Sequence, residues 1–112
     1  MRRSERLYLT DIVEACDSIE RSLRDRTFDD LIADEDARNS LLYRLVVIGE
    51  AVSGLTPELR QRHPEIRWGA VVGFRNRVVH GYFSLDWTTV WETATGAVPI
   101  LRGQIAAIVA EE

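Results

Sequence analysis

Residues 41–52 decide the fold of this chain, and they read LLYRLVVIGEAV. Apolar side chains recur there at helical spacing along two faces, formed by Leu41, Leu45, Ile48 and Val52 and by Leu42, Val46 and Gly49. A helix that is apolar on two faces lies in the centre of a bundle or at an interface between subunits. We expect this helix to open at the acidic run 34–36, whose charges suit a helix N-terminus, and to reach Ser53 before Gly54 ends it.

Further helices are expected on both sides of this central segment. They are 4–26, a short helix capped by Thr27, a short helix that starts at Thr56-Pro57 and ends before Pro64, 68–80 with Gly81 as its stop, and 87–110 capped by Asp86. Pro99 lacks the amide proton that an α-helix needs and is expected to kink the last helix. The sequence therefore predicts an all-α fold, a single domain over residues 1–112. It is an antiparallel bundle of three long helices, one medium helix and one or two short ones.

Composition excludes several kinds of chemistry. All 14 basic residues are arginine, so the chain has neither a Schiff-base lysine nor the lysine of a phosphate-binding P-loop. Its one cysteine, Cys16, excludes an intrachain disulfide and a multi-cysteine zinc site, and we expect it to be a small buried hydrophobe. No uninterrupted apolar run approaches the ~18 residues of a membrane span. The start lacks the apolar core of a signal peptide, so we expect a cytoplasmic protein without membrane contact.

Charge is unevenly distributed along the chain, whose formal net charge is -4. Residues 60–82 carry five arginines and one acid, Glu65, which gives this segment a net charge of +4, and they contain both histidines. A positive segment on an acidic protein favours a site that handles an anion. The competing interpretation is structural, with these arginines paired to the acidic run 34–36.

Candidate catalytic residues lie in the segment 73–82, which reads GFRNRVVHGY. Arg75 supplies a permanent charge that matches phosphate oxygens, and His80 supplies a side chain that exchanges a proton near neutral pH. Such a pair can cleave RNA without a metal, because histidine can take the proton of the ribose 2′-OH while arginine stabilises the charged transition state. The structural alternative makes His80 a cap charge at a helix C-terminus, Arg77 a surface ion pair and Tyr82 a core aromatic.

Helix geometry limits how Arg75 and His80 can meet. Five residues of an ideal helix rotate by about 140°, so the two side chains do not share a face. They converge only if Arg75 reaches around the helix, if the helix loosens near Gly81, or if a second subunit contributes, as in a symmetric dimer. Gly69 and Gly73 lie one turn apart on the same helix and predict the close approach of another backbone.

The same segment resembles a known family. Arg75, His80 and Tyr82 match the RX4HXY signature of the HepT-like toxin family, in the HEPN superfamily. The flanks agree, since residues 44–51 resemble the family's R…IGEA helix and residues 64–68 its P-x-I-x-W approach to the catalytic helix. Residues 87–101, which include Pro99, resemble its last helix. The resemblance covers essentially the whole chain and implies a HEPN-type bundle.

This resemblance also implies a function. HepT-like proteins are homodimers that pair their RX4HXY helices and act as metal-independent ribonucleases, without a cofactor, in toxin–antitoxin pairs of the type VII kind. Carried over to this chain, Arg75 and His80 are catalytic for RNA, and Asn76 follows the catalytic arginine where relatives have a polar residue. Tyr82 is the residue that accepts AMP from an MntA-like minimal nucleotidyltransferase antitoxin. Arg77 supports the site by adding positive charge beside it.

Two other functions remain open. The chain could be a non-catalytic HEPN dimer that binds RNA, a nucleotide or the transferase, or it could serve chiefly as the substrate of a modifying enzyme. Arg44 and Glu50 are charged residues on the apolar central helix, and we expect each to pair across helices or subunits, with Glu50 able to meet an arginine of the catalytic helix. His63, beside Pro64, is expected to be exposed. The tryptophans Trp68, Trp87 and Trp91 are expected in the core or at an interface.

Overall fold

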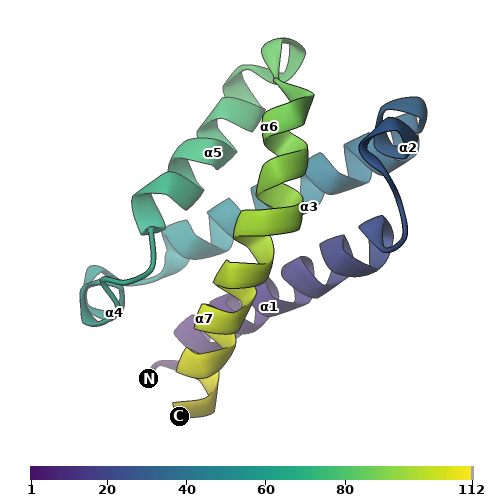
Figure 1. Ribbon diagram of the computed structural model, residues 1–112. Helices are drawn as coiled ribbons and strands as arrows, with labels where there is room; N and C mark the ends of the chain where they lie inside the picture. The colour runs from purple at the N-terminus through teal and green to yellow at the C-terminus, as the bar shows by residue number, and fades with distance from the viewer. Residues whose placement is uncertain (112) are drawn as a thin grey trace.

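The computed structural model describes residues 1–111, and no strand occurs among them. The helices are α1 (Arg3–Leu23), α2 (Phe28–Ala33), α3 (Glu35–Gly54), α4 (Pro57–Arg62), α5 (Trp68–His80), the 3₁₀ turn η1 (Tyr82–Ser84), α6 (Trp87–Glu92), the π-helical turn η2 (Thr93–Ala97) and α7 (Val98–Glu111). The expected all-α bundle is confirmed (Figure 1). Its long helices have the predicted order and nearly the predicted bounds.

The helices pack in a row, with α7 on α1, α1 on α3 and α3 on α5 (Figure 1). α3 is therefore the central helix that residues 41–52 predict, because it contacts α1 on one side and α5 on the other. The core lies mainly where α1, α3 and α7 meet. Its fully buried side chains include Leu9, Ile12 and Ile19 of α1, Val52 of α3 and Ile105 of α7.

Local capping explains where the shorter helices begin. The Thr27 and Thr56 hydroxyls accept hydrogen bonds from the N–H groups of Asp30 and Leu59, at 3.1 and 3.2 Å. The Asp86 carboxylate accepts one from the Thr88 N–H at 3.0 Å, and Asp34 opens α3 in the same way. Each cap satisfies an amide that a helix start leaves unpaired and typically contributes about 1 kcal/mol. The caps predicted at Thr27, Thr56 and Asp86 are confirmed.

A buried acid ties the start of α1 to the start of α4. The Glu5 carboxylate is 6% exposed and accepts a hydrogen bond from the Thr56 hydroxyl at 2.5 Å. This bond, with weaker ones from the Thr56 and Arg2 amides, lowers the pKa of Glu5 although burial acts in the opposite direction. Thr56 thus caps α4 and anchors α1 at the same time.

The last helix is a continuous rod, Trp87–Glu111, whose predicted distortion takes the form of the π-helical turn η2 just before Pro99. Proline has no amide proton, so the backbone bonds must shift register there. Thr93 and Thr95 add hydroxyl bonds to the carbonyls of Thr89 and Trp91, both at 2.8 Å, which favour a bend.

The same rod is long and apolar enough to cross a membrane by length and composition alone. The expectation from uninterrupted apolar runs did not include such a helix, because scattered polar residues divide the rod into short runs. Val90, Val98, Leu101 and Ile105 are buried in the bundle, but only 28% of the most apolar stretch of the rod is buried in all.

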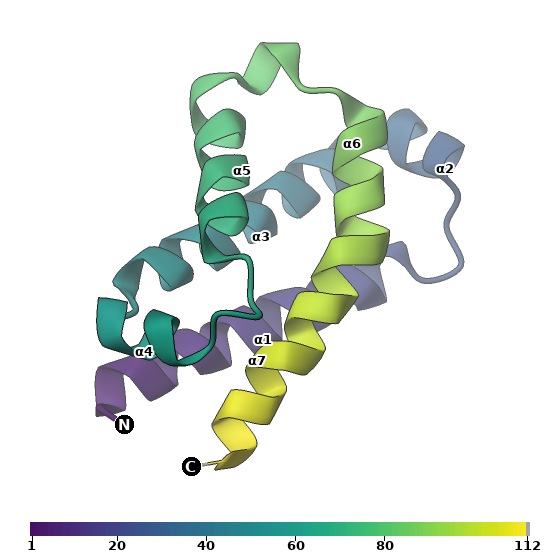
Figure 2. The ribbon, with the colours of Figure 1, turned by 60° about the vertical axis from the view of Figure 1, so that its left-hand side comes forward.

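Helix α5 stands at the end of the row and diverges from the α6–α7 rod (Figure 2). It packs on α3 and buries Trp68 and Val78, while most of its remaining residues are half-buried or exposed. Residues 81–86, which include η1, connect its end to α6. The fold thus presents the end of α5 at the edge of the bundle, away from the main core.

Candidate active site at the end of α5

Arg75 lies against the central helix. Its guanidinium forms an ion pair with Glu50 of α3 and donates a hydrogen bond to the Asn76 side-chain oxygen at 2.8 Å. The expected meeting of Glu50 with an arginine of this helix is confirmed. Its Nε atom is buried without a hydrogen-bond partner among the described residues. Arg75 is therefore oriented by two polar neighbours and keeps donor capacity for an additional acceptor.

Gly49 makes this orientation possible. A Cβ atom placed on Gly49 would lie 2.6 Å from Cγ of Arg75, closer than real side chains come. The aliphatic stem of Arg75 therefore crosses α3 at Gly49, a position that has no side chain. Sequence reasoning assigned Gly49 to an apolar face and missed this role. A glycine inside an otherwise apolar helix was the available signal, because it costs about 1 kcal/mol unless something packs against it.

His80 lies on another side of α5, at the rim of an open hollow of about 560 Å³ between α5 and α6. Asn76 and Arg77 line the same hollow, as do Ser84 and Asp86 beyond the end of the helix. The Arg77 guanidinium lies over the Phe74 ring, 5.2 Å from its centroid. This hollow combines a histidine, an arginine and several hydrogen-bonding groups in a space open to solvent.

Within one chain, Arg75 and His80 face different elements. α5 remains helical through His80, and the Gly81 N–H donates to the Arg77 carbonyl at 2.8 Å as the helix ends. The helix therefore does not loosen before Gly81, and Arg75 turns toward α3 instead of around the helix. Asn76 connects the two sides, because it accepts from Arg75 and also lines the hollow of His80.

Tyr82 begins η1, two residues after His80. Its ring is 45% exposed, and its hydroxyl donates a hydrogen bond to the side-chain oxygen of Asn39 in α3 at 2.8 Å. The neighbouring Phe83 is fully exposed and meets the Tyr82 ring edge to face, with centroids 5.3 Å apart. Tyr82 is therefore a surface residue with its hydroxyl at the edge of the protein, and the alternative of a core aromatic is wrong.

The positive segment keeps most of its charge available. Its ion pairs among the described residues join Arg75 to Glu50 and His63 to Glu65. Asp34, in the acidic run, pairs with Arg26 and not with an arginine of residues 60–82. The structural interpretation of this segment is thus not supported, whereas the interpretation as an anion site fits the exposed Arg77 and the half-buried Arg75.

His63 departs from expectation, since only 16% of its side chain is exposed. The reason is Trp68, whose indole N–H is 3.0 Å from the carbonyls of both Arg60 and His63 and draws the turn over itself. Trp68 is buried as expected, and Trp87 and Trp91 are half-buried. No group of three or more His, Cys, Asp or Glu side chains within residues 1–111 is arranged to hold a metal ion.

One face of α5 has open space beside it at Gly69 and Gly73. A Cβ atom added to either glycine would meet nothing within 4 Å, so the close backbone approach that these glycines predict is not made among the described residues. Asn76 and His80 continue the same helical face, are exposed and line the hollow between α5 and α6. The strip from Gly69 to His80 is therefore open at its start and borders this hollow at its end.

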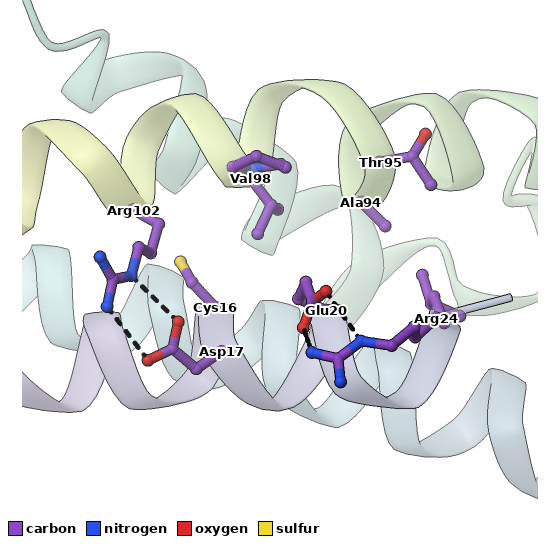
Figure 3. Close-up of a pocket in the computed structure, with 10 residues that line it drawn as sticks. Cys16, Asp17, Glu20, Arg24, Ala94, Thr95, Val98 and Arg102 are labelled. Carbon is purple, nitrogen blue, oxygen red and sulfur yellow. Dashed lines mark hydrogen bonds and ion pairs between the residues drawn. The ribbon is translucent and has the colours of Figure 1, made fainter.

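A second hollow, between α1 and the η2–α7 part of the rod, differs from the first in chemistry (Figure 3). Its rim carries two ion pairs, Asp17 with Arg102 at 3.0 Å and Glu20 with Arg24 at 2.5 Å, and the Cys16 thiol lies between the helices. Cys16 is 2% exposed, and burial raises its pKa to about 12, which confirms it as a small buried hydrophobe. The charged side chains at the rim of this hollow already neutralise each other in these two ion pairs.

Comparison with known proteins finds a matching family model and several similar proteins. A family model described as "Ribonuclease HepT-like" matches residues 12–108. "Probable ribonuclease HepT" of Thermococcus cleftensis is 34% identical over 104 residues, which cover 93% of this chain and 94% of that protein. "Putative RNase TTE0752" of Caldanaerobacter subterraneus is 29% identical over 110 residues, 98% of each chain. No solved structure matches this chain.

Proposed function

The chain belongs to the HepT-like ribonuclease family, and on that premise we propose that it is an endoribonuclease toxin that cleaves RNA without a metal ion. One observation carries the proposal at the level of residues. Glu50 and Asn76 orient Arg75, and Asn76 also lines the open hollow that holds His80. The motif residues therefore lie around one exposed end of α5, in the positively charged part of an acidic protein.

The proposed reaction is an internal transfer at phosphorus. His80 takes the proton of a ribose 2′-OH, and the 2′ oxygen bonds to the adjacent phosphorus while the bond from phosphorus to the 5′ oxygen breaks. The 5′ oxygen takes a proton from solvent as it leaves, His80 later returns its proton to solvent, and a 2′,3′-cyclic phosphate remains on the other fragment. Arg75 stabilises the negative charge that builds on the phosphate oxygens, and Arg77 adds positive charge at the hollow.

We further propose that the active form is a homodimer that pairs two copies of α5. The strip from Gly69 to His80 supports this, because it lacks side chains at Gly69 and Gly73, where an added Cβ atom would meet nothing within 4 Å. Arg75 and His80 of one chain face different elements, so a second copy would supply the missing group on each side. A dimer would also place two positive segments at one cleft.

Tyr82 is the proposed site of neutralisation by a minimal nucleotidyltransferase antitoxin of the MntA type. In that step Tyr82 Oη bonds to the α-phosphorus of ATP, the bond from that phosphorus to the bridging oxygen breaks, and pyrophosphate leaves. The phenolic proton passes to solvent. The exposed ring supports this role, and an added phosphate would compete with RNA for Arg77 and Arg75. We also propose that the protein acts in the cytoplasm, away from membranes.

A cleavage assay tests the proposal. Purified protein should cut single-stranded RNA in the presence of EDTA and leave a 2′,3′-cyclic phosphate, and His80→Ala should lower the rate at least about 100-fold, the lower end of what general base catalysis contributes. His63→Ala is the matched control and should cleave like the wild type. Full activity of His80→Ala would remove His80 from the mechanism, and activity abolished by EDTA would contradict cleavage without a metal.

A second candidate is a HEPN dimer that binds RNA, a nucleotide or the transferase without cutting. The ion pair of Arg75 with Glu50 favours it, because an arginine already paired is less available to a reacting phosphate. RNA retained on a filter by the wild type, with no cleavage product at any pH, would select this function over the first.

A further inference from the structure

The turn that follows His80 is fastened to the central helix through Tyr82. Tyr82 Oη donates to Asn39 Oδ1 at 2.8 Å and so joins η1 to α3. The Ser84 N–H and hydroxyl bond the Gly81 carbonyl, at 2.9 and 3.1 Å, and stabilise only the turn itself. Phe83 is fully exposed and packs on no helix. Leu85, which follows η1, packs against the core, and the Asn39 bond is the hydrogen bond that joins η1 itself to α3.

The chemistry of this bond sets what it does to the phenol. A side-chain amide oxygen accepts a hydrogen bond but does not remove the proton, so Asn39 orients Tyr82 without ionising it. With the hydrogen directed at Asn39, the lone pairs of Oη are left for groups that approach from solvent. An oxygen that carries an ester has no hydrogen to donate, so any modification of Oη abolishes the bond.

The surroundings of Asn39 also disfavour a phosphate at this position. Glu35 and Asp36 precede Asn39 by one helical turn and lie on the same face of α3. A phosphodiester on Tyr82 would place a negative charge near these carboxylates, whereas Arg77 and His80 line the hollow between α5 and α6. Repulsion by the carboxylates and attraction to Arg77 favour movement of a modified Tyr82 away from α3.

We propose that Asn39 is a positioning residue for Tyr82: it holds the unmodified phenol on α3 with its oxygen open to solvent, and modification of that oxygen releases η1 from α3. The first half stands on the hydrogen bond alone. The second half rests on the proposed transfer of AMP to Tyr82. Inactivation then combines a blocked hollow with a loosened turn next to His80.

Amide hydrogen exchange of residues 81–85 tests the first half in the unmodified full chain. We expect about threefold faster exchange in Asn39→Ala and in Tyr82→Phe, which remove the acceptor and the donor, and no further increase in the double variant. Asn39→Asp keeps an acceptor and should restore the wild-type rate. Tyr43→Phe, which alters an exposed tyrosine one turn along α3, should leave it unchanged. Wild-type exchange in Asn39→Ala, or additive effects in the double variant, would overturn the role of Asn39.

The second half is tested with ATP and a purified MntA-type nucleotidyltransferase, followed by mass spectrometry. We expect residues 81–85 of the modified wild type to exchange as fast as they do in the Tyr82→Phe variant. We also expect the Asn39→Ala variant to take up AMP about threefold more slowly than the wild type. Slow exchange in the modified protein would overturn the release step. Absence of AMP on the wild type would contradict the proposed modification itself, while the exchange rates of the unmodified variants would still decide whether Asn39 positions Tyr82.

Discussion

The core formed by α1, α3 and α7 and the arm formed by α5 and η1 are built in different ways. α1 buries a stripe of seven residues, from Glu5 to Leu23, whereas α5 buries only Trp68 and Val78. Partly buried apolar side chains of the arm also pack against the core, and two polar contacts add to them, Glu50 to Arg75 and Asn39 to Tyr82. This difference indicates that the core provides most of the free energy of folding, whereas the arm holds the charged candidate groups at the surface.

The largest expected effect breaks the core. Ile12→Ala removes a fully buried side chain and should lower the free energy of unfolding by about 2–5 kcal/mol. Val79→Ala, on the arm, removes a side chain that is 46% exposed and should cost less than about 1 kcal/mol. Chemical denaturation of both variants measures the two values. Equal losses would contradict the division between a stabilising core and a lightly packed arm.

A smaller effect is expected where the arm meets the core. Gly49→Ala forces the Arg75 stem away from α3 and should cost about 1–3 kcal/mol, with loss of RNA cleavage because Arg75 no longer reaches Glu50. Denaturation and the cleavage assay give the two readouts. An alanine tolerated at Gly49 without change in either would show that the close crossing of α3 and α5 has no role in orienting Arg75.

Gly73→Ala is the matched control for this crossing. Open space surrounds Gly73 within the chain, so alanine should stabilise the isolated helix slightly, by up to about 1 kcal/mol. If two copies of α5 meet at this strip, the same variant should weaken the dimer in light scattering while the fold remains intact. A dimer unaffected by Gly73→Ala would place the proposed interface elsewhere.

Some features of the fold and of the candidate site could be predicted from the sequence, and others could not. Helix starts at Thr27, Thr56 and Asp86 follow from neighbouring residues, and so they could be predicted. The motif residues stand in one short segment, which made the candidate site visible. Of the contacts that orient them, the meeting of Glu50 with an arginine of α5 could be predicted. The crossing at Gly49 and the Asn39 bond could not, because they depend on how helices far apart in sequence pack.

The partial burial of His63 was missed for the same reason. The indole of Trp68 bonds to the turn that contains His63, whereas a histidine before a proline predicts only an exposed turn. Sequence reasoning therefore named candidate catalytic groups and one residue that orients them, Glu50, but missed two other residues that place them. The missed groups are small or neutral residues, Gly49 and Asn39, whose roles arise only from tertiary contacts.

The smallest expected effect concerns the polar contact inside the core, between Glu5 and Thr56. Because the hydrogen bonds lower the pKa of Glu5 below its ordinary 4.5 in the folded protein, its ionised form stabilises the fold at higher pH. That contribution should be complete above about pH 5 and should be lost as the pH falls below the ordinary pKa and through the lowered one. Glu5→Gln should cost about 1 kcal/mol at pH 7 and progressively less as the pH falls below 4.5, as measured by denaturation at pH 7 and at an acidic pH. An equal loss at both pH values would assign the stabilisation to packing of the side chain. Ionised groups would then contribute to stabilising contacts in the arm and not in the core, and the contrast between the two regions would be sharper.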